Sequence, residues 1–175
     1  MNFNDKILVL DGAMGTMIQK YGLDERDFHK PVPADDLVNR DPAALKALEQ
    51  SRMELKGNNE CLNLTRPDII FDIHRKYIEA GADIIESNTF SANSISQEEY
   101  GLADIAGEMA RQGAAIARRA ADQSGRKVYV AGSVGPTSKS LTLAQNVEHP
   151  EYRPYGFREM VSAYMKQIRG LIDGG

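Results

Sequence analysis

The fold is decided by residues 67–90, which read PDIIFDIHRKYIEAGADIIESNTF. Ile70, Ile73 and Tyr77 recur at the spacing of one helical face, and Gly81 is placed to end that helix. The segment that follows, ADIIES (82–87), is short and centred on two isoleucines, which predicts a strand buried within a sheet. A helix that leads directly into a buried strand is typical of α/β proteins with parallel sheets.

The same alternation extends in both directions along the chain. Residues 6–10, KILVL, predict a first strand buried on both faces, and residues 13–22 predict a short helix after it. Residues 104–124 predict an alanine-rich helix, 127–133 a third strand, and 157–172 an amphipathic helix. Each connection is long enough for a right-handed crossover, so we expect an α/β fold with parallel strands.

Residues 30–55 predict an additional helical insertion between the first and second strands. Asp41 is a favourable N-cap, Pro42 suits the first helical position, and AALKALEQSRMEL contains strong helix formers. One face of this helix would carry Leu45, Leu48, Arg52 and Leu55. The segment KGNNE (56–60) is predicted to end the helix as a loop.

The composition excludes several classes of protein. The chain has 175 residues, 42% of them hydrophobic, and a net charge of -4, with an isoelectric point near 5.4. An acidic chain with scattered basic residues argues against a nucleic-acid partner. No apolar run is long enough to span a membrane, and the N-terminus lacks the pattern of a signal peptide, so we expect a cytoplasmic protein.

The cysteine and histidine content bears on metal binding. Cys61 is the single cysteine, so the chain cannot form an internal disulfide or a zinc site with two of its own thiolates. We interpret Cys61 as a buried apolar residue and His74 as a surface or packing residue. No two histidines are spaced as a metal pair. We therefore predict no metal ligand in this chain.

Three polar segments follow the three predicted strands. They are DGAMGT (11–16), ESNTF (86–90) and GSVGPT (132–137). In parallel α/β folds, ligands bind at the carboxyl ends of the strands. Each segment alone could be a simple turn or helix cap, but three at equivalent positions favour a binding site. The predicted substrate-binding residues are Asp11, Gly12, Gly15, Thr16, Glu86, Asn88, Thr89, Ser133, Gly135 and Thr137.

These residue types suit a zwitterionic ligand such as an amino acid. Asp11 and Glu86 could pair with an ammonium group, and backbone N–H groups near Gly12 and Gly15 could hold a carboxylate. Side chains such as Asn88 would supply neutral hydrogen bonds. The segments are poorly suited to bind phosphate, because they contain no lysine or arginine. A phosphate-binding α/β enzyme is therefore disfavoured.

The same residues resemble a known family. The segments ILVLDGAMGTMIQ (7–19), KGNNECLNLTRPDIIFDIHRKYIEAGADIIESNTFSAN (56–93) and VAGSVGPTSK (130–139) are similar to the homocysteine S-methyltransferase family. Within that family they most resemble the N-terminal module of cobalamin-dependent methionine synthases. The resemblance implies a (β/α)8 TIM barrel, of which residues 1–175 would form the N-terminal part with about the first three βα units.

The resemblance also implies an activity. Family members transfer a methyl group to homocysteine, whose thiolate is activated by zinc held on cysteines from the second half of the barrel. In methionine synthases the donor is methylcobalamin, and folate- and cobalamin-binding modules follow in the same polypeptide. Asp11 and Gly12 match positions near the amino and carboxylate groups of homocysteine, and the residues after the second and third strands match the pocket lining.

The zinc-binding cysteines have no counterpart here, so we assign no catalytic residue and expect the isolated 175-residue chain, a fragment on this view, to be inactive. We also expect that neither zinc, cobalamin nor homocysteine binds it tightly. Two alternatives remain: a standalone methyltransferase that uses betaine or S-methylmethionine, and a non-catalytic α/β assembly module that completes its sheet by oligomerising.

Overall fold

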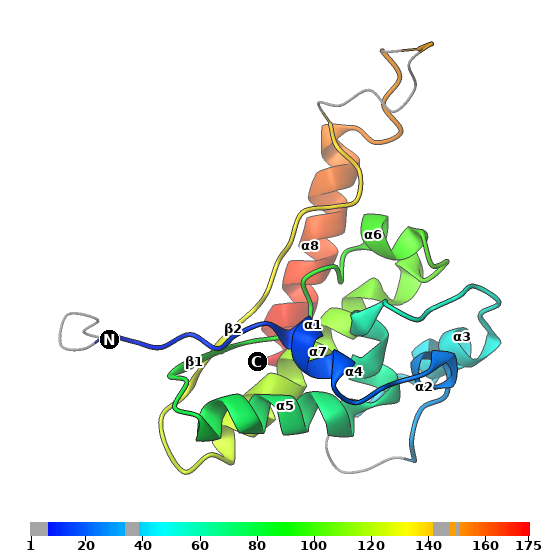
Figure 1. Cartoon of the computed structure of the whole chain (residues 1–175). Coiled ribbons are helices and arrows are strands. Elements are labelled where there is room, and N and C mark those ends of the chain that lie inside the picture. The colour runs from blue at the N-terminus through cyan, green and yellow to red at the C-terminus, as the bar shows by residue number, and fades with distance from the viewer. Residues whose placement is uncertain (1–6, 34–38, 142–147, 150) are drawn as a thin grey trace.

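The computed structural model describes residues 7–33, 39–141, 148–149 and 151–175 (Figure 1). Its sheet contains two parallel strands, β1 (Ile84–Glu86) and β2 (Tyr129–Ala131), with Ile85 opposite Val130. On the other side of β1, Leu10 forms an isolated parallel bridge to Ile84. The chain is therefore an α/β protein rich in helices, and the two strands lie within the predicted segments 82–87 and 127–133.

The prediction of a first strand at residues 6–10 is wrong in part. Lys6 lies outside the described residues, and only Leu10 makes a bridge to the sheet. The backbone N–H of Asp11 donates to Ile84 O at 2.9 Å, so the segment does run parallel to β1. It is not buried on both faces, because Ile7 is 91% exposed and Leu10 is half exposed. Among the described residues, nothing covers the outer face of this segment.

The described residues include three long helices. They are α5 (Pro67–Glu79), α7 (Ala106–Asp122) and α8 (Phe157–Gly174), and each falls where the apolar periodicity predicts it. Helix α5 starts with proline at its first position and is followed by Gly81, whose φ of 108° lies in the region that favours glycine. That turn sends the chain directly into β1.

Before residue 67, the described residues include four short helices and one 3-10 turn. These are α1 (Met14–Gln19), α2 (Glu25–His29), α3 (Pro42–Gln50), a 3-10 turn at Asn59–Cys61, and α4 (Leu62–Thr65). The sequence predicted α1 but not α2 or α4, which are too short to show a helical period. Asp24 caps α2 by accepting from the N–H of Arg26 at 2.9 Å.

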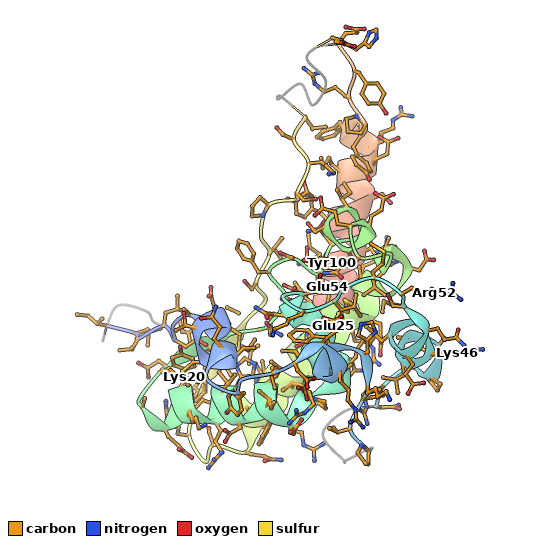
Figure 2. All side chains as sticks on the ribbon, turned by 45° about the vertical axis from the view of Figure 1, so that its right-hand side comes forward. Lys20, Glu25, Lys46, Arg52, Glu54 and Tyr100 are labelled. Atoms are coloured by element: carbon orange, nitrogen blue, oxygen red, sulfur yellow. The ribbon has the colours of Figure 1, made fainter. Side chains whose placement is uncertain are left out.

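The predicted insertion helix is shorter than expected. Helix α3 begins at Pro42 as predicted but ends at Gln50, so Leu55 is not helical. The carboxylate of Glu25 accepts the N–H groups of Leu55 at 2.6 Å and Lys56 at 2.8 Å, which holds this segment in a non-helical conformation. Arg52 does not share a buried face with Leu55, because Arg52 is exposed and extends outward on the α3 side in Figure 2.

The main core lies among the helices of the N-terminal half and α5 and α7. It includes Cys61, which is fully buried as predicted, and it is completed by Leu48, Leu62, Ile70, Ile73 and Met109, among others. A smaller cluster around Ile85 joins β1 to α7. Helix α6 (Ser94–Glu98) and a 3-10 turn at Ala103–Ile105 connect the strand end to α7.

His74 in α5 is a packing residue rather than a surface residue. It is fully buried, and neither of its ring nitrogens has a hydrogen-bond partner among the described residues. Burial lowers the pKa of His74 to about 4, because the imidazolium form would lose its hydration. His74 is therefore neutral at physiological pH.

Helix α8 packs mainly against α7 and then extends beyond the other helices (Figure 1). Its C-terminal part lies very close to α7, since a Cβ at Gly170 would be 2.4 Å from the carbonyl oxygen of Gly107. Its N-terminal part leaves Phe157 and Val161 exposed. No helix in the described part of the chain is long and apolar enough to cross a membrane.

Candidate functional site

A cavity of about 510 Å³ opens where the two strands and the N-terminal segment end. It is bordered by the start of α1, by the turn at residues 57–60, and by the loops after β1 and β2. The predicted site residues that line it are Asp11, Gly12, Gly15, Glu86, Asn88, Thr89 and Ser133. Strand-end segments far apart in the sequence therefore do meet at one edge of the sheet, as parallel topology requires.

Asp11 and Glu86 lie side by side on this wall. One carboxylate oxygen of Asp11, Oδ2, accepts the backbone N–H of Glu86 at 3.0 Å. The other oxygen, Oδ1, is buried and has no partner among the described residues. Burial raises the pKa of Asp11 to about 6. The hydrogen bond from the Glu86 N–H acts in the opposite direction, and the negative charge of Glu86 raises the pKa further. A positively charged ligand group close to the Asp11 carboxylate would favour its ionised form.

The hydroxyls of the β1 loop join it to the β2 loop. Ser87 Oγ and Thr89 Oγ1 are 2.7 Å apart, and Thr89 donates to Ser133 O at 2.8 Å. Ser133 N–H in turn donates to Ser87 Oγ at 3.1 Å. From α8, Gln167 Nε2 donates to Thr89 O at 2.6 Å. These bonds set the position of the β2 loop relative to β1.

Asn88 is held by a second asparagine from α4. The amide nitrogen of Asn88 donates to Asn59 O at 2.8 Å and to Asn63 Oδ1 at 3.0 Å. Asn63 donates to Asn88 O at 2.7 Å and to Met109 O at 3.0 Å. Because both N–H groups of the Asn88 amide already have acceptors, its side chain can offer a ligand only its oxygen as an acceptor.

The turn at residues 57–60 also contributes to the cavity, although it is not among the predicted site residues. Asn59 and Glu60 both line the cavity, and Glu60 is buried. Glu60 Oε1 accepts the N–H of Ser91 at 2.8 Å, while burial raises the pKa of the carboxyl group. The segment 56–60 was predicted to be a plain loop. No local pattern indicates that this loop packs inward, because a glutamate in a polar loop is ordinarily exposed.

Three predicted site residues do not line the cavity. Thr16 lies on α1 with its side chain exposed. Gly135 lies under the ring of Phe90, and a Cβ there would be 2.6 Å from ring carbons. Thr137 borders a neighbouring cavity of about 310 Å³ and donates to Lys139 O at 2.6 Å. The β2 loop turns away from the strand axis after Ser133, so equivalent sequence positions do not reach the same space.

Residues 8–175 match the homocysteine S-methyltransferase family, which is nearly the whole chain. The chain belongs to this family. Among solved structures, it is similar in fold to the homocysteine methyltransferase MmuM from Escherichia coli. The metallated form of that protein shares 22% identity at a TM-score of 0.62, and the match covers 98% of this chain and 52% of the other.

The oxidised form of MmuM gives a similar result, with 23% identity, a TM-score of 0.60, and coverage of 98% of this chain and 51% of that one. The chain thus spans about half the length of the solved structures it matches. At this level of identity the likeness shows a shared fold. The chain is thus an α/β protein similar in fold to this homocysteine methyltransferase.

The residues described here do not fit the zinc that the family resemblance implies. Across residues 7–33, 39–141, 148–149 and 151–175, no three His, Cys, Asp or Glu side chains are grouped to hold a metal ion. Cys61 faces the core, and burial raises the pKa of its thiol well above the usual range. A buried, protonated thiol is a poor ligand. We assign no zinc ligand to the described part of the chain.

Proposed function

We propose that the cavity binds the amino acid moiety of homocysteine, in a methyltransferase that transfers a methyl group to the homocysteine sulfur. The charge of the cavity is the observation that supports this most directly. Asp11, Glu60 and Glu86 line it, and none of its described lining residues is a lysine, arginine or histidine. Such a surface favours an ammonium group and disfavours an anionic ligand such as phosphate.

The start of α1 supports binding of the carboxylate. Helix α1 begins at Met14 without a side-chain cap, so its first N–H groups can donate to a ligand. Gly12 and Gly15 line the cavity here without side chains that would block access. An ammonium group near Asp11 and a carboxylate near Gly15 would leave the thiol-bearing end of homocysteine directed away from the α1 wall.

In this proposal the described residues bind and orient the substrate. Methyl transfer requires the sulfur electron pair to form the new S–CH₃ bond while the donor leaves with the electrons of the broken bond. We assign no proton-transfer or metal-binding residue in the described chain to that step. For the donor we propose methylcobalamin, supplied by folate- and cobalamin-binding modules of the same polypeptide as in methionine synthases.

Binding of homocysteine should depend on the ionisation of Asp11. As the pH rises through about 6, Asp11 loses its proton, and the affinity for the ammonium group should increase until the carboxylate is fully charged. Replacing Asp11 by Asn should weaken binding by roughly tenfold to a hundredfold, because a charged hydrogen bond contributes about 1.5–3 kcal/mol. The measurement is an NMR titration that follows the backbone amides of Gly12, Glu86 and Ser133.

Asp122→Asn is the matched control, because Asp122 is an exposed carboxylate on α7 outside the cavity. It should bind homocysteine as the unmodified chain does. Amide shifts confined to residues outside the cavity would contradict the proposed site. An affinity that changes neither with pH nor on replacement of Asp11 would contradict it too.

The donor is tested with the complete protein. Methionine formed from methylcobalamin and homocysteine, with no product from S-methylmethionine or betaine, is the expected result. Product from S-methylmethionine or betaine alone would instead support the standalone methyltransferase. Either result leaves the proposed substrate site of this chain unchanged.

A further inference from the structure

Glu60 lies between two cavities, and so far only its acidic character has entered the account of the site. It belongs to the 3-10 turn at Asn59–Cys61, and only 7% of its surface is exposed. It lines the 510 Å³ cavity and also the neighbouring 310 Å³ cavity, together with Gly57 and Ser91. Glu60 and Ser91 therefore form part of the wall that separates the two spaces.

The hydrogen bonds of this wall converge on one peptide group. The N–H of Ser91 donates to Glu60 Oε1 at 2.8 Å. The carbonyl of Phe90, which belongs to the same peptide group, accepts the N–H of Gly135 at 2.9 Å. Because a peptide group is planar and rigid, fixing the direction of its N–H also fixes the direction of its C=O. The carboxylate of Glu60 and the β2 loop are therefore bonded to the same rigid peptide group, Glu60 to its N–H and Gly135 to its C=O.

Neighbouring contacts strengthen this arrangement. The ring of Phe90 lies against Gly135 so closely that a Cβ at Gly135 would be 2.6 Å from ring carbons. On the other side, Gln97 Nε2 donates to Ser91 O at 3.1 Å and pairs with Asn58. Rotation of the Phe90–Ser91 peptide would break the bond to Gly135 and move the ring that covers it.

The connection reaches the ligand cavity through Ser133. This residue is two positions before Gly135, lines the 510 Å³ cavity, and is joined to Thr89 and Ser87 by hydrogen bonds. If the Gly135 N–H loses its acceptor, the β2 loop keeps the bonds at Ser133, the contact between Tyr164 and Gly135 O at 3.2 Å, and more distant bonds from Ser138 and Lys139 to the α6 segment.

We propose that Glu60 is a positioning residue for the ligand cavity: through the Phe90–Ser91 peptide, its carboxyl oxygen holds the β2 loop against the β1 loop. We call this set of contacts between Glu60, the Phe90–Ser91 peptide and Gly135 the clamp. Its geometry follows from the hydrogen bonds given above, and only the identity of the ligand rests on the proposed function. The role needs an acceptor at the position of Oε1. Glutamine can supply that acceptor, whereas alanine cannot, and aspartate is one methylene too short.

The direct test is amide hydrogen exchange measured by NMR on the 175-residue chain. In Glu60→Ala, and in Glu60→Asp in case the alanine variant fails to fold, exchange at Ser91 and Gly135 should both accelerate about tenfold or more. Tenfold corresponds to about 1.4 kcal/mol. In Glu60→Gln both amides should stay protected. Glu54→Ala, which removes an exposed carboxylate of the preceding segment, is the control and should change neither amide.

Exchange in the interior of α5 and α7 separates this effect from general destabilisation, since it should not change in any variant. Faster exchange at Ser91 with unchanged exchange at Gly135 would overturn the proposal, because the two bonds would then be independent. Equal acceleration in the glutamine variant would overturn it too.

A homocysteine titration on the same samples completes the test. Weaker binding in the alanine or aspartate variant, restored in the glutamine variant, is the expected result. If homocysteine shifts no cavity amide in any sample while Ser91 and Gly135 respond as described, the proposed substrate is wrong and the clamp stands. If homocysteine binds equally to all variants, Glu60 does not position the cavity.

Discussion

The loops after β1 and β2 occupy equivalent positions in the sheet but differ in how they are held. In the loop after β1, Ser87, Asn88 and Thr89 are buried and bonded to neighbouring segments. In the segment after β2, Val134 is 44% and Leu141 38% exposed. The difference shows that one wall of the cavity is part of the core, whereas the other lies nearer the surface and is held by hydrogen bonds to the first wall, to α8 and to the α6 segment.

The cause is the element that covers each loop. The β1 loop lies against α7, where Thr89 and Asn63 approach Gly113 too closely for any side chain at that position. The segment after β2 is contacted by α8, whose N-terminal part extends beyond the other helices (Figure 1). Substitutions in the two regions should therefore differ in their effect on the free energy of unfolding.

The largest effect is expected at Asn63. Replacement by alanine removes its hydrogen bonds to Asn88 and Met109 and leaves buried polar groups without partners. We expect a loss of about 3 kcal/mol in the free energy of unfolding, since each buried unsatisfied group costs about 1–3 kcal/mol. Urea denaturation followed by circular dichroism measures this loss. A loss below about 0.5 kcal/mol would show that the β1 loop is not held through α4.

An intermediate effect is expected at Gly113. In Gly113→Ala the new Cβ would lie 2.5 Å from Thr89 Cγ2 and 2.7 Å from Asn63 Nδ2. Overpacking costs about 1–3 kcal/mol, and the higher helix propensity of alanine recovers up to about 1 kcal/mol, so we expect a net loss of roughly 1–2 kcal/mol. Thermal unfolding is a suitable measurement.

Gly107→Ala on the same helix is the matched control. A Cβ there meets the flexible side chain of Lys166, with Cγ at 3.2 Å, so this variant should be neutral or slightly more stable. Equal losses in the two variants would mean that the sensitivity belongs to α7 as a whole rather than to its contact with the β1 loop.

The smallest effect is expected at Thr137. Its hydroxyl donates to Lys139 O within the same loop, and its removal leaves no core group without a partner. Thr137→Ala should change the free energy of unfolding by less than about 0.5 kcal/mol, and homocysteine binding should not change. If Thr137→Ala lowered the free energy of unfolding as much as Asn63→Ala in the same urea experiment, the two loops would not differ in their contribution to stability.

Much of the fold could be predicted because its signals are local. The periodicity of α5, α7 and α8, the proline that starts α5, and the glycine after it depend on neighbouring residues along one segment. Burial was predicted less well. The apolar run at residues 7–10 was expected inside the sheet and is largely exposed, because burial depends on which elements cover it. The end of α3 depends on Glu25, which is distant in sequence.

For the site, local patterns are enough to predict which residue types follow the strands, and parallel topology then requires Asp11, Glu86 and Ser133 to meet. Three features of the site follow from the folded arrangement alone: Glu60 lines the cavity, Thr16 and Thr137 do not, and the pKa of Asp11 is raised. The physical reason is that strand order and helix period follow from short-range patterns. Burial and hydrogen-bond partners depend on segments separated by tens of residues, which become neighbours only in the folded chain.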